Sequence, residues 1–151
     1  MPSVLFVCTG NIHRSPMGEY LWRAKVNDQN QAWQIASAGT MTKNGWRTNQ
    51  EVITTLAGYG LDPVEHRSQE ITRQLLEEYN LTLVMTRNHK EALRAEFPDL
   101  AGKIYLLSEM VGLRHDVEDP IGGPLVEYEA TAREIDDYLT RGFDKICELA
   151  G

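Results

Sequence analysis

The amino-acid sequence predicts a three-layer α/β fold, in which a four-stranded parallel sheet is flanked by helices on both faces. Four short apolar segments, typical of buried strands, alternate with longer segments whose apolar residues recur at helical spacing. Strands that alternate with helices in this way pair in parallel, and the connecting helices cover both faces of the sheet. In such folds the ligand binds beyond the carboxyl ends of the strands, where the strand order reverses.

The first strand ends at a cysteine and leads through a short loop into a helix. Residues 4–7 are all apolar, residues 8–11 form a turn, and helical spacing continues to about Val26. The spacing from Cys8 to Arg14 is C-x5-R. The apolar positions of the predicted helix are Met17, Tyr20, Leu21 and Ala24. Cys8 therefore lies where an α/β fold binds its ligand.

The middle of the chain supplies a second strand and a capped helix. A polar run at residues 27–31 ends the first helix, and residues 33–37 alternate as a strand. After a polar loop, Thr48 with Glu51 three residues later makes a capping box, which predicts the start of a helix. Glycines at positions 58 and 60 end that helix.

The second half of the chain continues the alternation. We predict a short helix over residues 71–79 and strands over 81–85 and 103–107. Between these strands lies a helix that Asn88 and Glu91 can cap and that ends at Pro98. A loop over residues 112–124 is followed by one long amphipathic helix. Its apolar face consists of Tyr128, Ala132, Ile135, Leu139, Gly142, Phe143, Ile146 and Leu149.

Length and composition indicate a single domain over residues 1–151, long enough to bury a core. A formal charge of −7 makes nucleic acid an improbable partner. There is no apolar run of membrane-spanning length and no signal-peptide pattern, so we expect a cytoplasmic protein without a membrane partner. The two cysteines, Cys8 and Cys147, provide no disulfide framework and no metal quartet, and we expect neither metal nor cofactor.

The loop after the first strand has the composition of an anion site. Backbone N–H groups in a tight loop, backed by a helix N-terminus, bind anions, and Gly10 and Asn11 tolerate the positive φ values that such loops need. Arg14 adds a planar fork of donors that matches two phosphate oxygens. The same positive surroundings favour the thiolate of Cys8, a nucleophile directed at the bound phosphorus.

The stretch VCTGNIHRSPMGEYL resembles the signature loop of the low-molecular-weight protein tyrosine phosphatases. The resemblance continues in family order at residues 37–40, 60–62, 66–68, 84–86 and 119–120, and it covers essentially the whole chain. It implies a sheet of order 2-1-3-4 and a phosphocysteine intermediate. It also implies that Asp119, followed by Pro120, is the general acid, which then activates water to release inorganic phosphate.

The resemblance extends to residues around the phosphate. It implies a supporting hydrogen-bond network of Asn11, Ser15, Ser37 and His66, with Ser15 donating to the Cys8 thiolate. The residues expected to contact the substrate are Thr9, Gly10, Asn11, Ile12, His13, Arg14 and Ser15 of the loop, with Met41, Trp46 and Ile121 at its rim. His89 and His115 have no such context, and we predict that both lie on the surface.

The chain departs from the family pattern at two places. His13 stands where many members have a second cysteine that protects the nucleophile, and Cys147 is predicted to be a core residue of the last helix. His13 either raises the local positive charge or points to solvent. Downstream of Asp119, Ile121 and two glycines replace the aromatic residues of many tyrosine-directed members. Substrate preference therefore rests on Ile12, because a branch that acts on phosphoarginine has threonine there.

The predicted function is hydrolysis of phosphotyrosine in a phosphorylated protein. Phosphoarginine is the alternative substrate, favoured by the two glycines that follow the Asp-Pro pair. A thiol-dependent arsenate reductase shares the fold but needs further cysteines, and only Cys147 is present. A third alternative is a non-catalytic phosphate-binding module; Arg14 together with Asp119 argues against it, because a phosphate carrier has no need of an acid for a leaving group.

Overall fold

A parallel sheet of four strands forms the centre of the computed structural model, which describes residues 1–151. The strands are β1 (Ser3–Cys8), β2 (Gln34–Gly39), β3 (Leu81–Val84) and β4 (Ile104–Leu106). They lie in the order β2-β1-β3-β4, and every neighbouring pair is parallel. The predicted fold class and the predicted strand order 2-1-3-4 are confirmed.

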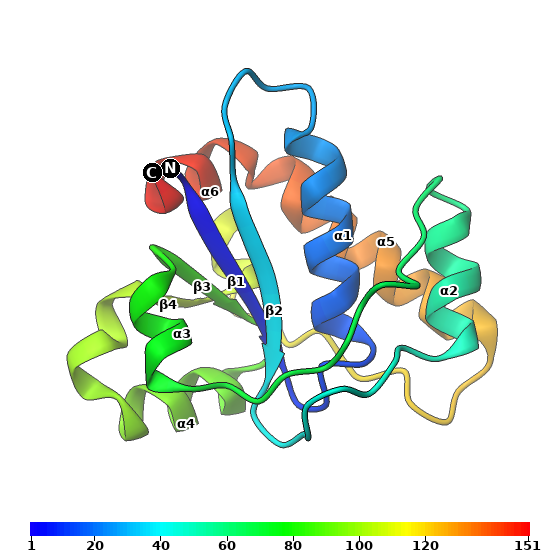
Figure 1. Ribbon diagram of the computed structural model, residues 1–151, viewed down its shortest axis with the longest axis horizontal. Coiled ribbons are helices and arrows are strands. Elements are labelled where there is room, and N and C mark those ends of the chain that lie inside the picture. Colours follow the sequence, from blue (N-terminus) through cyan, green and yellow to red (C-terminus); the bar gives the residue numbers. More distant parts are fainter.

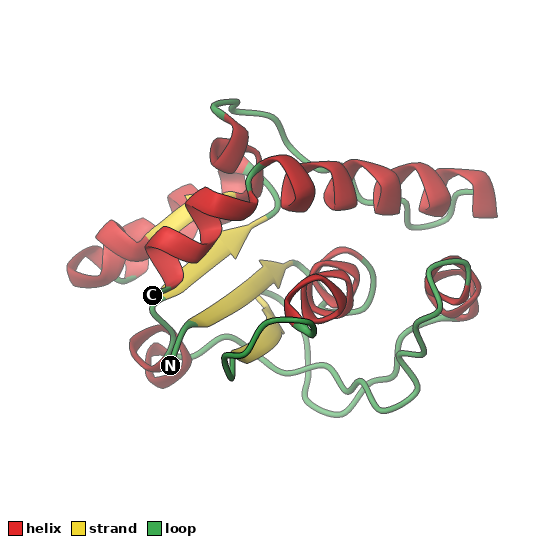
Figure 2. Ribbon diagram, turned by 90° about the horizontal axis from the view of Figure 1, so that it is seen from above, coloured by secondary structure: helices red, strands yellow, loops and turns green.

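Helices cover both faces of this sheet (Figures 1 and 2). One face carries α1 (Arg14–Val26), α5 (Leu125–Arg141) and α6 (Phe143–Ala150), and α2 (Gln50–Ala57) packs on α5. The other face carries α3 (Arg73–Glu78) and α4 (Arg87–Glu96). Two 3-10 helices, η1 (Pro98–Lys103) and η2 (Leu107–Val111), flank β4. No helix combines the length and the apolar character needed to cross a bilayer.

The side chains of β1 alternate between two cores. Val4 and Phe6 face the layer of α1, α5 and α6, whereas Leu5 and Val7 face α3 and α4. All four are fully buried. Burial of an apolar side chain of this size contributes about 1.5–3 kcal/mol. Because β1 is buried on both faces, it has an unbroken apolar sequence up to Cys8.

Two helix starts differ from the predictions. Asn49, not Thr48, is the N-cap of α2, and its side chain accepts a hydrogen bond from the backbone N–H of Val52. The hydroxyl of Thr48 instead donates to the backbone carbonyl of Ile12 in the anion loop. Thr86, rather than Asn88 or Glu91, caps α4. In the first case a tertiary contact takes the side chain that the local pattern assigned to capping.

The predicted C-terminal helix is two helices, which meet at Gly142. A Cβ atom at this position would lie 2.6 Å from Cβ of Met110 and 2.8 Å from the carbonyl oxygen of Tyr138. Only glycine allows the chain to pass η2 so closely. The amphipathic pattern spans the junction because both helices pack on the same core.

The carboxyl ends of the strands define one edge of the sheet. Cys8 pairs with Gly39 there, and Val7 pairs with Val84. The loops that follow these strands gather below the strand arrowheads in Figure 1, whereas the two chain termini lie together at the opposite end. The fold thus brings residues from four distant segments to the edge at which α/β proteins bind ligands.

Candidate active site

The loop between β1 and α1 presents a row of unpaired backbone donors. The N–H groups of residues 9–13 make no hydrogen bond to another backbone group of the protein. Asn11 adopts φ 55°, and no other residue except glycine has a positive φ. Gly10 does not, so the prediction of a left-handed conformation holds for Asn11 alone. Unpaired amides that converge in a tight loop form a cradle for an anion.

Arg14, the first residue of α1, extends its guanidinium across this loop. The side chain is buried, and Nη1 donates to the carbonyl of Val117 (2.9 Å). Nη2 lies 3.3 Å from Oγ1 of Thr9 and 3.6 Å from Oδ2 of Asp119. Nε is buried and has no partner within the protein. A buried guanidinium donor without a partner is the group that an oxyanion would satisfy.

The sulfur of Cys8 lies 3.0 Å from the hydroxyl oxygen of Ser15. Nδ2 of Asn11 donates to that same oxygen (2.8 Å) and to the hydroxyl of Ser37 (2.9 Å). Because the Ser15 oxygen accepts from Asn11, its proton can point at the sulfur or at the carbonyl oxygen of Ala38, which is more distant (3.4 Å). Donation to the sulfur would stabilise a thiolate. The structure thus brings three residues of the predicted supporting network to the predicted nucleophile.

The network continues further than the sequence predicted. His66 contacts the carbonyl oxygen of Asn11 through Nε2 (2.7 Å), which brings the fourth predicted member to the loop. Ser37 donates to the buried carboxylate of Glu19 (2.6 Å), which also pairs with Arg23 (2.6 Å). Glu19 was missed, although it lies one helical turn after Ser15 and therefore on the same face of α1.

The end of β2 and the two residues after it hold the loop from the other side. The backbone N–H of Thr40 donates to the carbonyl of Cys8, and that of Met41 donates to the carbonyl of Thr9 (both 2.9 Å). A Cβ atom on Gly39 would lie 2.6 Å from the carbonyl oxygen of Thr9. Glycine at this position therefore allows β2 to approach the anion loop.

His89 contradicts its predicted place on the surface. It is buried at the start of α4, and its Nε2 lies 2.8 Å from Oγ1 of Thr9. Its Nδ1 accepts a hydrogen bond from the backbone N–H of Thr86 (3.2 Å). Burial, together with the positive charge of Arg14, lowers the pKa of His89 to about 4. His89 is therefore neutral at neutral pH and donates to Thr9, whereas His115 is exposed as predicted.

The loop over residues 112–124 brings Asp119 to the rim of the anion loop. Oδ1 lies 3.1 Å from Nδ1 of His13 and accepts from the backbone N–H of Ile121 (3.1 Å). About a third of the side chain (32%) is exposed, so a substrate can reach it. Asp116 is engaged elsewhere: the backbone N–H and the guanidinium of Arg87 bind it and lower its pKa.

A hollow of about 370 Å³ opens beside the loop. Among the predicted substrate contacts, Thr9, Arg14 and Met41 line this hollow, whereas Trp46 and Ile121 are exposed and do not. The hollow is completed by Thr40, Thr86, Asn88, His89 and Ala92. Ile12 is half-buried and packs over the Cα of Gly10, and His13 is buried rather than pointing to solvent.

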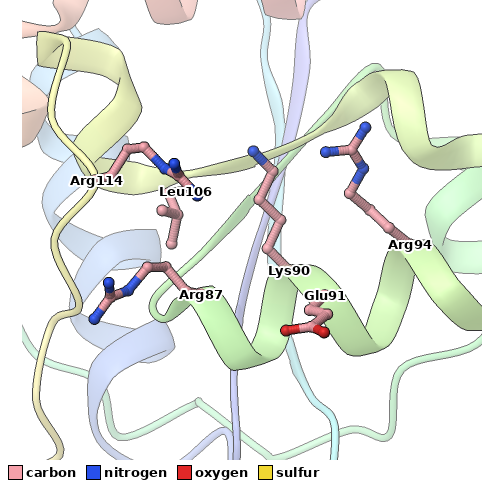
Figure 3. Close-up of a pocket in the computed structure, with 6 residues that line it drawn as sticks. All are labelled: Arg87, Lys90, Glu91, Arg94, Leu106 and Arg114. Carbon is pink, nitrogen blue, oxygen red and sulfur yellow. The ribbon is translucent and has the colours of Figure 1, made fainter.

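A second hollow of similar size lies over α4 and contains four cationic side chains (Figure 3). Two of these cations already have carboxylate partners: Arg87 pairs with Asp116 and Lys90 with Glu109. Leu106 is its single apolar lining residue, and no residue of the C-x5-R loop lines it. Thr9 and Arg14 of that loop line the first hollow, so the loop together with the first hollow is the candidate active site, although Cys8 itself is not among the lining residues.

A cysteine that begins a loop of unpaired amides, with a buried arginine and a carboxylate beside it, is the arrangement of a cysteine-dependent phosphomonoester hydrolase, and the comparison with known proteins supports this class. The chain belongs to the low molecular weight phosphotyrosine protein phosphatase family, whose model matches residues 3–148. The family resemblance of the sequence is thereby confirmed.

Relatives of both substrate classes are similar to this chain. A protein-arginine-phosphatase from Bacillus subtilis is 31% identical over 137 residues, which are 90% of this chain and 91% of that protein. A probable low molecular weight protein-tyrosine-phosphatase, EpsP, from Ralstonia nicotianae is 31% identical over 142 residues, which are 94% and 91% of the two chains. The solved low molecular weight protein tyrosine phosphatase from T. tengcongensis superposes with a TM-score of 0.90 at 38% identity, covering 96% of this chain and 99% of that one.

Proposed function

We propose that this enzyme hydrolyses phosphotyrosine residues of a protein through a phosphocysteine intermediate on Cys8. The observation that carries the proposal is the approach of Asp119 to the loop that begins at Cys8 and ends at Arg14. The Cys8 sulfur lies beside Ser15, the guanidinium of Arg14 has a buried donor without a partner, and the Asp119 carboxylate lies beside that guanidinium. A nucleophile, an anion clamp and an acid are the three groups that phosphate-ester cleavage needs.

In the first step the phosphate of the substrate accepts from the loop amides and from Arg14. The Cys8 thiolate attacks phosphorus, and the bond between phosphorus and the leaving oxygen breaks. Asp119 gives its proton to that oxygen, so the phenol departs neutral. Arg14 and the amides keep their positions, and their charge stabilises the transferring phosphoryl group.

In the second step water replaces the phenol. Asp119, now a carboxylate, accepts a proton from this water while the water oxygen attacks the phosphorus of phosphocysteine. The sulfur leaves as a thiolate, which Ser15 stabilises by donating its hydroxyl proton. The products are the dephosphorylated protein and inorganic phosphate, and the carboxyl group of Asp119 is protonated again.

Ile12 supports an aromatic substrate. Its half-buried side chain lies over Gly10 in the anion loop, where it offers an apolar surface to a phenyl ring. Exposed Met41 adds a flexible thioether to the adjacent hollow. Neither side chain has a group that would bind the guanidinium of phosphoarginine.

Hydrolysis of phosphoarginine is the second candidate function. Two glycines, Gly122 and Gly123, follow Asp119-Pro120, and the similar Bacillus subtilis protein is named for that activity. The two candidates differ in substrate and share Cys8, Arg14 and Asp119.

Cys147 argues against a reductase that relays a disulfide. It lies in α6, and the carbonyl of Ala150 at the end of this helix accepts from Asn80, directly before β3. This places the end of α6 at the amino edge of the sheet, away from Cys8. Burial also raises the pKa of Cys147, which disfavours its thiolate.

The test is a comparison of kcat/KM on peptides of one sequence that carry either phosphotyrosine or phosphoarginine. We expect the larger value for phosphotyrosine and no turnover of either peptide by Cys8→Ser. A larger value for phosphoarginine would favour the second candidate. Turnover that survives in Cys8→Ser would overturn both.

A further inference from the structure

His13 connects the anion loop to Asp119. Its ring is buried, with Nδ1 3.1 Å from Oδ1 of Asp119 and Nε2 3.0 Å from Nδ2 of Asn49. The rings of His13 and Tyr128 form a T-shaped pair, with centroids 5.5 Å apart. The cap of α2 and a residue of α5 therefore fix the orientation of a side chain that lies between the nucleophile loop and the acid.

The cap of α2 determines which nitrogen of His13 carries the proton. Oδ1 of Asn49 accepts from the backbone N–H of Val52 (3.1 Å), so its amide nitrogen must face the other way. That nitrogen lies within hydrogen-bond distance of Nε2 of His13 and of the hydroxyl of Tyr128 (3.2 Å). An amide nitrogen only donates, so Nε2 of His13 accepts and Nδ1 carries the proton.

The same logic assigns the two oxygens of Asp119. Oδ1 accepts from Nδ1 of His13 and from the backbone N–H of Ile121. Two donors leave no room for a proton on this oxygen in its present orientation. Oδ2 lies 3.6 Å from Nη2 of Arg14, the group that clamps the phosphate. The oxygen that carries the transferable proton is therefore Oδ2.

We propose that His13 is a positioning residue: its Nδ1–H, oriented by Asn49, anchors Oδ1 of Asp119 and thereby directs Oδ2 toward the leaving oxygen of the substrate. This inference rests on the proposed function, because it takes Asp119 as the general acid. It deepens that function by assigning one task to each oxygen. In the first step the proton leaves Oδ2 for the departing phenol, and in the second step Oδ2 takes a proton from water.

Asp119 needs such an anchor because its own loop gives its carboxylate a single hydrogen bond, from the N–H of Ile121. The loop is tied down before Asp119, at Asp116 by Arg87 and at Val117, whose N–H donates to Met85 (2.8 Å) and whose carbonyl accepts from Arg14. Beyond Val117, Pro120 is buried, but Glu118 and Ile121 on either side of the Asp-Pro pair are exposed. Without His13 the only donors near the carboxylate are Arg14 and the N–H of Ile121, and Arg14 draws the carboxylate toward the phosphate clamp. Misplacement of a reacting group by about 1 Å can cost on the order of 100-fold in rate.

Two substitutions separate the contributions of the two ring nitrogens of His13 to activity. In His13→Asn the side-chain amide overlays Nδ1 and can still donate to Asp119, whereas in His13→Gln the amide overlays Nε2 and contacts Asn49 instead. We expect His13→Gln to lower kcat/KM about tenfold for phosphotyrosine, a poor leaving group, and much less for p-nitrophenyl phosphate. His13→Asn should recover most of the loss. The control is His115→Asn, which replaces an exposed histidine on the same loop as Asp119. This variant should leave kcat/KM unchanged for both substrates.

A double variant separates positioning from a merely structural role. In the Asp119→Asn background, His13→Gln should cause little further loss, because the proton it positions is gone. An equal loss for all leaving groups, or a full further loss in the double variant, would overturn the proposal.

Nitrogen-15 NMR of the histidine-labelled protein tests the tautomer without any turnover. We expect Nδ1–H for His13 at mildly alkaline pH, the reverse of the tautomer that free histidine prefers, and a change of its signals in Asn49→Asp. An Nε2–H tautomer would overturn the anchoring. Failure of the proposed function is a separate result, since it would appear as a wild-type enzyme without phosphatase activity, whatever the tautomer.

Discussion

The two loops that form the active site are held in different ways. The loop from Cys8 to Arg14 is fixed from several sides by β2, by α1, by His66 and by the hydroxyl of Thr48. The first half of the loop over residues 112–124 is fixed at His115 by Ser108, at Asp116 by Arg87 and at Val117 by Met85 and Arg14, whereas the carboxylate of Asp119 is held by His13 and one backbone N–H of its own loop. The nucleophile loop is thus held along its whole length, whereas the acid lies beyond the fixed half of its loop and depends on few contacts.

Because the two loops are held differently, substitutions in them should have different effects on activity. A change in the loop of Cys8 should affect every substrate, because all substrates share the phosphoryl group. A change in the loop of Asp119 should affect substrates in proportion to the basicity of the leaving oxygen. The predictions below test that division.

The largest effect is expected for Cys8→Ser. Turnover of every phosphate ester should be lost, because a serine hydroxyl stays protonated at neutral pH and is a far weaker nucleophile than a thiolate. Inorganic phosphate should still bind, since the amides and Arg14 hold the anion. Phosphate titration followed by NMR measures the binding. Loss of phosphate binding in this variant would show that the sulfur holds the loop together.

Asp119→Asn should lower kcat/KM by roughly 10²–10³-fold for substrates with poor leaving groups. The loss should shrink as the leaving phenol becomes more acidic, because an activated phenolate needs no proton. A series of aryl phosphates of increasing phenol acidity measures this slope. If kcat/KM of Asp119→Asn falls by the same factor for every aryl phosphate of the series, Asp119 is not the general acid. Glu118 would then be the next residue to test.

The nucleophile loop could be predicted from the sequence more directly than the position of the acid. The strand, the turn and the C-x5-R spacing are local features, so the position of Cys8 and Arg14 follows from residues that are close in the chain. The Asp-Pro pair becomes informative only through its resemblance to the family. Its approach to Arg14 depends on a contact between residues that are 103 positions apart.

The residues that were missed or misassigned are those whose environment comes from distant segments. Glu19 has Arg23 four residues later, a pattern typical of an exposed helix, yet Ser37 and the helix packing bury it. His89 precedes Lys90 on a polar helix, and its partner Thr9 is 80 positions away. The break at Gly142 depends on Met110. The spacing of Glu19 from Ser15 is the one local sign of these contacts, and it becomes informative only once the distant partner Ser37 is known.

The buried His89 makes the free energy of unfolding of the protein depend on pH. Its pKa is about 4 in the folded protein and near 6.5 in the unfolded chain. As the pH falls from about 6.5 to about 4, the unfolded chain binds a proton that the folded protein does not, so the free energy of unfolding falls by up to roughly 3 kcal/mol. Above pH 6.5 the residue adds no pH dependence.

Chemical denaturation at several pH values measures this loss. His89→Gln keeps a donor for Thr9 and cannot titrate, so its unfolding free energy should depend less on pH in that window. An unchanged dependence in this variant would show that His89 is not the group responsible.

The smallest effect is expected for Ile12→Thr. A hydroxyl in place of a branched apolar side chain weakens contact with a phenyl ring and offers a polar partner to a guanidinium. The ratio of kcat/KM for phosphotyrosine over phosphoarginine should fall by a few-fold. Ile12→Val is the matched control, since it keeps the branched apolar surface. A ratio that does not change, or that rises, would remove Ile12 from substrate selection.

The most direct test of the account is detection of the phosphorylated enzyme. Wild-type protein and the Cys8→Ser variant are mixed with p-nitrophenyl phosphate, quenched within one turnover, and analysed by mass spectrometry of the peptide that contains Cys8. The account predicts one added phosphoryl group on Cys8 of the wild type, formed no more slowly than turnover. Turnover without any phosphorylated Cys8, together with activity in Cys8→Ser, would contradict it.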